Sequence, residues 1–91
     1  MVGFTQTNSS EGRDFGRQPI DQLMVEKGID NHQLVEASTE QLTHKQVQRA
    51  RKGRRLTANM QGKVLAAWTR LSRAQGDARQ WRMSDLFDYE A

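Results

Sequence analysis

Residues 44–55 contain six lysine or arginine side chains and no carboxylate, so the chemistry that this stretch offers is the binding of anions. Lys45, Gln48, Arg49 and Lys52 recur at i, i+3, i+4 and i+7, which places them on one face if the segment is helical. Such a face can hold phosphate groups, and an arginine can donate two hydrogen bonds to the major-groove edge of guanine. The pattern indicates a nucleic-acid partner, although a basic face that meets only solvent has the same composition.

The net charge of the whole chain, +3, conceals a division along the sequence. Residues 1–40 carry three basic and seven acidic side chains, residues 41–76 carry nine basic and no acidic ones, and residues 77–91 carry two basic and four acidic ones. A segment of 36 residues without a carboxylate favours a polyanionic partner for the middle of the chain.

Length and composition bound the class of protein. The 91 residues suit one small domain, and a mean hydropathy of −0.88 predicts a small core, built most economically from helices. The chain has no cysteine, which excludes a disulfide framework and cysteine-ligated zinc. No apolar run approaches the roughly 18 residues that span a bilayer, and the N-terminus lacks the pattern of a secretory signal. We therefore expect a cytoplasmic protein with no membrane partner.

Capping residues predict where the first two helices begin and end. Pro19 suits the first turn of a helix, and Gly28 would end that helix in the left-handed conformation. Asp30, followed by Gln33, has the form of a capping box and predicts a short second helix that ends before Ser38.

Two more helices are predicted in the basic part of the chain. Thr43 is expected to cap a helix over residues 44–52 that Gly53 ends, and Thr57 to cap a helix over about residues 58–73. The apolar positions of these two helices predict a shared core. Its expected members are Val47, Ala50, Met60, Val64, Ala67, Trp68 and Leu71.

The two ends differ in composition from residues 18–74, the predicted helical domain. Residues 1–17 are polar and glycine-rich, and we expect a disordered arm in which Phe4 and Phe15 stay unpacked. Residues 75–91 hold large apolar side chains and predict an ordered segment that either seals the core or contacts a second copy of the chain. In this segment Trp81 and Met83 alternate like a short strand, and Ser84 could cap one helical turn.

Two short helices in succession, the second with a basic outer face, resemble the helix-turn-helix of the Cro/C1-type family of bacterial and phage repressors. The shared spacing over residues 18–72 comprises a glycine–aliphatic–cap triplet, a leucine four residues after the cap, and an aliphatic–threonine pair. An aliphatic residue four positions after that threonine, a glycine six positions later and then basic residues complete the pattern. The matching residues are Gly28, Ile29, Asp30, Leu34, Leu42, Thr43, Val47 and Gly53. The chain departs from the family at Gln41, where a turn glycine is usual, and in a longer connection between Leu34 and Val47.

The resemblance implies roles for individual residues of this chain. In the family, the third helix faces bases, and Arg49 is the best candidate here for a bidentate contact to guanine. The candidate base-reading residues are His44, Lys45, Gln48 and Arg49, with Gln46 as an auxiliary. The candidate phosphate-binding residues are Asn31, Thr43, Lys52, Arg54 and Arg55. Arg51 is expected instead to pack its stem against the domain.

Other functions fit the residues less well. His32 and His44 have no cysteine or convergent carboxylates at metal-ligand spacing, and there is no nucleophile-elbow or phosphate-loop motif, so an enzyme is not expected. RNA binding lacks stacking aromatics within the basic stretch, and a membrane-surface helix lacks a broad apolar side. A protein-interaction module, such as an antitoxin or an accessory factor, could use the same helices.

The sequence thus predicts an all-α, four-helix bundle-like helix-turn-helix domain with a disordered N-terminal arm and a short ordered C-terminal segment. Its predicted function is sequence-specific binding of double-stranded DNA by the helix at residues 44–52, in a small transcriptional regulator. A homodimer formed through the C-terminal segment is a further expectation. No cofactor, metal or small-molecule ligand is implied.

Overall fold

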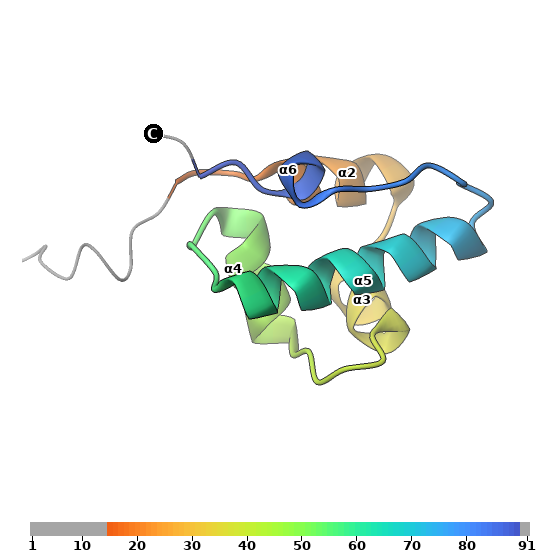
Figure 1. Ribbon diagram of the computed structural model, residues 1–91, viewed down its shortest axis with the longest axis horizontal. Helices are drawn as coiled ribbons and strands as arrows, with labels where there is room; N and C mark the ends of the chain where they lie inside the picture. The colour runs from red at the N-terminus through yellow and green to blue at the C-terminus, as the bar shows by residue number, and fades with distance from the viewer. Residues whose placement is uncertain (1–14, 90–91) are drawn as a thin grey trace, which may run out of the picture.

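The computed structural model describes residues 15–89, and within this part of the chain every regular element is a helix (Figure 1). The expectation of an all-α protein is confirmed. The described helices are α2 (Pro19–Lys27), α3 (Asn31–Ala37), α4 (His44–Lys52), α5 (Ala58–Ala74) and the single turn α6 (Met83–Leu86). The predicted bounds of the first four are confirmed, except that α5 is one residue longer than expected.

The polar caps proposed for the short helices are formed. Gln33 N donates to Asp30 Oδ1 at 2.8 Å, and Asp30 N donates to Gln33 Oε1 at 2.9 Å, which completes a capping box at α3. Thr43 and Gln46 make the same pair of bonds at α4, at 3.1 and 3.0 Å. Each cap satisfies backbone donors that would otherwise lack a partner and contributes about 1 kcal/mol, which matters for helices of two turns.

Helix α5 is the central element of the arrangement, with α2 and α6 on one side and α3 on the other (Figure 1). The side chain of Trp68, in the middle of α5, has no exposed surface. The buried apolar side chains form one cluster that draws on every helix. Its members are Ile20, Met24, Ile29, Leu34, Leu42, Val47, Ala50, Val64, Ala67, Trp68, Trp81, Leu86 and Phe87.

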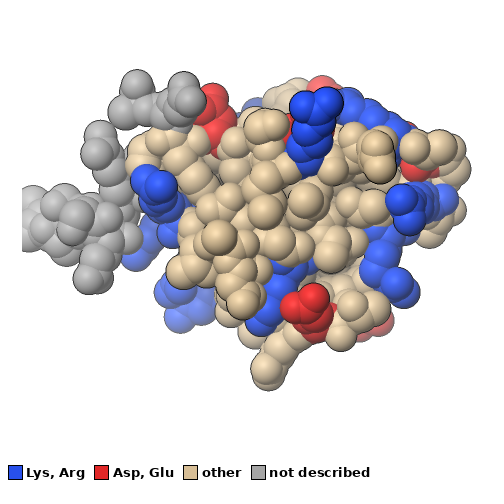
Figure 2. Space-filling model, in the orientation of Figure 1, with Lys and Arg blue, Asp and Glu red and all other residues tan. Residues whose placement is uncertain are grey.

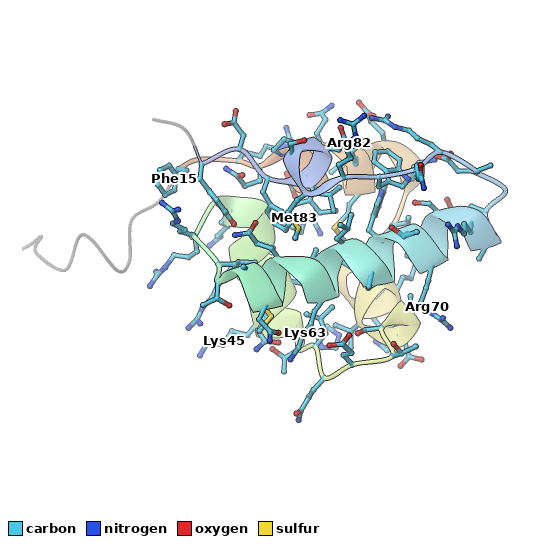
Figure 3. The ribbon with its side chains drawn as sticks, in the orientation of Figure 1. Phe15, Lys45, Lys63, Arg70, Arg82 and Met83 are labelled. Atoms are coloured by element: carbon cyan, nitrogen blue, oxygen red, sulfur yellow. The ribbon has the colours of Figure 1, made fainter. Side chains whose placement is uncertain are left out.

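The C-terminal segment packs onto this core. The ring of Trp81 meets that of Trp68 edge-on, with centroids 5.5 Å apart, and Leu86 and Phe87 are buried beside them. Met83 points from α6 toward α5 (Figure 3). The segment therefore seals the core of its own chain, whereas contact with a second copy stays a prediction.

Two local predictions for this segment were wrong. Met83 begins a helical turn and does not continue an alternating strand. Ser84 is not the cap of that turn: Arg82 is the extended N-cap residue, and its N–H donates to Asp85 Oδ2 at 2.8 Å. Ser84 is already the second residue of the turn, so it cannot precede the turn as its cap, and the carboxylate of Asp85 suits the positive end of the helix dipole.

The prediction that Phe15 is unpacked was also wrong. Its ring lies 5.2 Å from that of Tyr89, and its N–H donates to the Gly53 carbonyl at 2.9 Å. Gln18 N likewise donates to the Arg51 carbonyl at 3.1 Å, so residues 15–18 run alongside the end of α4. Residues 15–17 thus belong to the packed part of the chain, while the rest of the expected arm, Phe4 included, lies outside the described residues.

Candidate nucleic-acid interface

Helix α4 presents one polar face and one buried face. Val47 and Ala50 have no exposed surface and hold the helix against the core. The outer face consists of exposed side chains, namely His44, Lys45, Gln48, Arg49 and Lys52. The predicted base-reading residues His44, Lys45, Gln48 and Arg49 therefore do lie together on the surface. Gln46, the predicted auxiliary, instead uses its side chain in the capping box of α4.

The cations on this face have no acidic partner among the described residues. Ion pairs form at Arg17, Lys27, Arg51 and Arg79, but none includes Lys45, Arg49 or Lys52. Figure 2 shows basic side chains at the edge of the molecule that α4 and the following segment occupy. Within residues 15–89, an anionic ligand would not have to displace a carboxylate from these groups.

His44 is held at the start of α4 by a ring contact. Its imidazole stacks on that of His32 in α3, with centroids 5.6 Å apart and planes inclined by 17°. His32 Nε2 in turn lies 3.8 Å from Glu36 Oε2 on the same helix. The first turns of α3 and α4 are therefore side by side.

The segment after α4 carries two more exposed cations, Arg54 and Arg55, at a fixed position. The Tyr89 hydroxyl accepts a hydrogen bond from Leu56 N and donates one to the Arg54 carbonyl, each at 3.3 Å. The Arg55 guanidinium lies 5.8 Å above the same tyrosine ring. Burial raises the pKa of the Tyr89 hydroxyl, against the effect of the Leu56 N–H and the charge of Arg55. The C-terminal segment thus positions two of the predicted phosphate-binding residues.

Two other predicted phosphate-binding side chains already have partners inside the domain. Thr43 Oγ1 accepts from Gln46 N in the α4 cap. Asn31 donates through Nδ2 to Gln48 Oε1 at 3.0 Å and accepts through Oδ1 from Arg51 Nη1 at 2.6 Å. A phosphate contact would therefore fall to the unused hydroxyl hydrogen of Thr43 or to the backbone amides at the start of α3.

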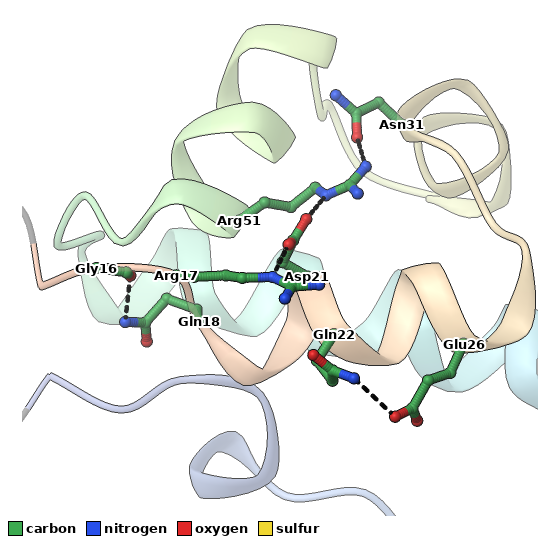
Figure 4. A network of polar contacts seen from close by, with 8 residues as sticks. All are labelled: Gly16, Arg17, Gln18, Asp21, Gln22, Glu26, Asn31 and Arg51. Atoms are coloured by element: carbon green, nitrogen blue, oxygen red, sulfur yellow. Dashed lines mark hydrogen bonds and ion pairs between the residues drawn. The ribbon is translucent and has the colours of Figure 1, made fainter.

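An ion-pair network behind α4 joins three helices, and sequence reasoning did not find it (Figure 4). The carboxylate of Asp21 in α2 accepts from Arg17 and from Arg51 Nε, and Arg51 continues to Asn31 in α3. Partial burial alone would raise the pKa of Asp21, but the hydrogen bonds from Arg17 and Arg51 outweigh it and hold the pKa below its ordinary value of 3.8. The expectation that Arg51 packs against the domain fits its partly buried position.

The connection between α3 and α4 explains the missing turn glycine. Among the described residues, positive φ occurs only at glycines, so Gln41 does not adopt the left-handed conformation. Six residues between Ala37 and His44 make the turn without it.

Arg70 Nε on α5 donates to the Ala37 carbonyl at 3.0 Å and so holds the end of α3. Lys63 and Arg70 extend from α5 on the side of the molecule where Lys45 lies in Figure 3, and neither was predicted as a site residue.

Metal ligands and membrane-spanning helices can be assessed within residues 15–89. That part of the chain contains no group of three or more histidine and acidic side chains that could hold a metal ion. It also contains no helix that is both long and apolar enough to cross a membrane. Comparisons with models of protein families, with curated proteins and with solved structures found no match.

Proposed function

We propose that this protein binds duplex DNA through α4 and acts as a small transcriptional regulator of the Cro/C1 helix-turn-helix type, with α3 as the supporting helix and α4 as the recognition helix. The observation that carries the proposal is the outer face of α4, where exposed cations and amides stand together with no acidic partner among the described residues.

The dimensions of the elements support this assignment. An α-helix fits the major groove of B-DNA, and residues near its N-terminus then reach base edges. The two-turn helix α4 has His44 and Lys45 at its start and Gln48 and Arg49 one turn later. In the proposed complex Arg49 donates to guanine O6 and N7, while Lys45 and Gln48 contact neighbouring bases.

The cations around α4 would bind the DNA backbone. Lys52 lies at the end of α4, and Arg54 and Arg55 follow on the segment that Tyr89 holds. Phosphate contacts of this kind fix the position of the protein on the duplex without reading sequence.

The first test is the dependence of binding on salt. If about five phosphates are neutralised, the logarithm of the association constant should fall with the logarithm of salt concentration with a slope of about −4 to −5. Fluorescence anisotropy of a labelled mixed-sequence duplex at several salt concentrations measures this slope. Absence of binding at low salt and micromolar protein would refute the proposal.

The second test separates base contacts from phosphate contacts. Arg49→Ala should weaken binding to a selected site by about 1–3 kcal/mol and relax its sequence preference, because a bidentate base contact is lost. Arg55→Ala is the matched control, since it removes the same charge outside α4 and should weaken all duplexes about equally. Equal behaviour of the two variants would contradict the assigned division.

A further inference from the structure

We infer that the Asp21–Arg51 ion pair behind α4 determines, through Asn31, which hydrogen-bonding group of Gln48 faces outward, and that Gln48 therefore reads a base offering acceptors, guanine in particular. This inference rests on the proposed function. Asp21, Arg51 and Asn31 act in it as positioning residues, because none of them need touch the base.

The first step is the contact between charges. A carboxylate only accepts hydrogen bonds and a guanidinium only donates them. Arg51 Nε donates to Asp21 Oδ1, and Asp21 also accepts from Arg17 (Figure 4). This arrangement fixes the plane of the Arg51 guanidinium and aims its Nη1 toward α3.

The second step is the amide of Asn31. Arg51 Nη1 donates to Asn31 Oδ1 at 2.6 Å. The opposite orientation of the amide would bring the Asn31 NH₂ group against a guanidinium that cannot accept, so the oxygen must face Arg51. Its Nδ2 is then turned toward α4.

The third step transfers this orientation to the outer face of α4. Asn31 Nδ2 donates to Gln48 Oε1 at 3.0 Å. Gln48 is exposed, and its Nε2 donates to none of residues 15–89. A flipped Gln48 amide would place two NH₂ groups together and lose this bond. The polarity set by the ion pair thus leaves the NH₂ group of Gln48 directed at a ligand.

The outward NH₂ group of Gln48 favours bases that present hydrogen-bond acceptors in the major groove. Guanine presents two adjacent acceptors, N7 and O6, whereas cytosine presents an N4 donor that would oppose the Gln48 NH₂ group. A bidentate contact discriminates by about 5- to 150-fold between the right and the wrong base, and a single NH₂ donor should fall toward the lower end of this range. Reversal of a G·C pair opposite Gln48 should cost affinity within this range.

The experiment first locates the base pair and then breaks the relay, which is the line of hydrogen bonds from Asp21 through Arg51 and Asn31 to Gln48. Gln48→Ala, assayed on duplexes that vary one base pair at a time, identifies the pair at which preference disappears. Arg51→Gln then replaces the obligate donor with an amide that can turn either way, and the guanine preference at that pair should fall to about twofold or less. Lys52→Gln is the matched control, because it removes one cation from the neighbouring position outside the network. It should lower affinity for both duplexes by the same factor and leave their ratio unchanged.

A second pair of variants tests the middle of the relay, and each variant adds one negative charge to α3. Asn31→Asp keeps the acceptor for Arg51 and removes the donor to Gln48, so the guanine preference should again collapse. Gln33→Glu adds the same charge two residues away and keeps the α3 capping box, since Glu is also an acceptor at that position. Gln33→Glu should leave the guanine preference intact. Arg51→Lys retains an obligate donor and should therefore keep more of the guanine preference than Arg51→Gln does.

A measurement on the free protein separates failure of the relay from failure of the proposed function. Side-chain amide exchange of Asn31, followed by NMR, should be slow in the unaltered protein and in Lys52→Gln and faster in Arg51→Gln. Fast exchange in all three, or a guanine preference that survives Arg51→Gln, would overturn the relay even if DNA binds. Slow exchange without binding to any duplex would leave the relay formed but overturn both the base preference and the proposed function.

Discussion

Substitution of Gly53 by alanine should destabilise the domain more than any other single methyl group added at a helix end, because two separate effects meet at this residue. Gly53 ends α4 with φ of +103°, a conformation that costs a residue with a Cβ roughly 1–2 kcal/mol. A Cβ at this position would also overlap the backbone of Gly16, which passes against it. The substitution must therefore push residues 15–18 away from α4.

The structure gives the size of the second effect. The backbone bonds from Phe15 N to the Gly53 carbonyl and from Gln18 N to the Arg51 carbonyl would be lost, at about 0.5–1.5 kcal/mol each. Together with the strain, Gly53→Ala should lower the free energy of unfolding by about 2–5 kcal/mol. Small domains are stable by only about 5–15 kcal/mol, so this is a large fraction of the total.

Gly28→Ala is the matched control. Gly28 ends α2 with φ of +66°, and a Cβ there would meet no other atom within 4 Å, so only the backbone strain of about 1–2 kcal/mol applies. Urea denaturation followed by the fluorescence of the two buried tryptophans, Trp68 and Trp81, measures both variants. If Gly53→Ala loses no more stability than Gly28→Ala, residues 15–18 do not pack against α4 in solution and the reasoning is refuted.

Three other perturbations test the fold. Trp68→Ala should cost about 3–5 kcal/mol in urea denaturation, because the side chain is fully buried against Trp81, and an unchanged midpoint would mean that α5 is misplaced. Asp21→Asn should destabilise the protein most at neutral pH. The pKa of Asp21 is lowered on folding, so its stabilising effect is lost as the pH falls below 3.8 and through the folded pKa. A stability difference between the unaltered protein and Asp21→Asn that does not change with pH would contradict the ion pairs. Truncation after Gly76 should prevent folding, seen by circular dichroism, because Trp81 and its neighbours leave the core. A truncated chain that keeps its helices but changes from dimer to monomer by light scattering would instead show that the segment serves dimerisation.

The helices of this protein are largely determined by local sequence. Asp30 with Gln33 and Thr43 with Gln46 are capping pairs that can be recognised in the sequence, and Gly28 and Gly53 mark helix ends. Caps act over three or four residues, so these boundaries need no knowledge of the tertiary structure. The exposed face of α4 follows from the same periodicity, because the positions of Val47 and Ala50 fix which side is buried.

The two ends of the described chain could not be predicted in the same way. Phe15 and Tyr89 are far apart in sequence, and neither belongs to a periodic pattern, so nothing local shows that their rings meet. The turn α6 begins at Met83 after an extended Arg82 whose N–H donates to Asp85, although the sequence offers Ser84 as a cap. Such segments take their conformation from the surface on which they pack.

The sequence by itself determined that the chain is helical, where its helices begin and end, and that one face of the third predicted helix is basic, since propensity, capping and periodicity are local properties. Only the tertiary structure decided that Asp21, Arg51, Asn31 and Gln48, from three helices, form one line of hydrogen bonds. Hydrogen-bond polarity depends on which donor meets which acceptor within about 3 Å. The packing of α2, α3 and α4 sets that pairing, and the spacing of these residues along the sequence does not predict it.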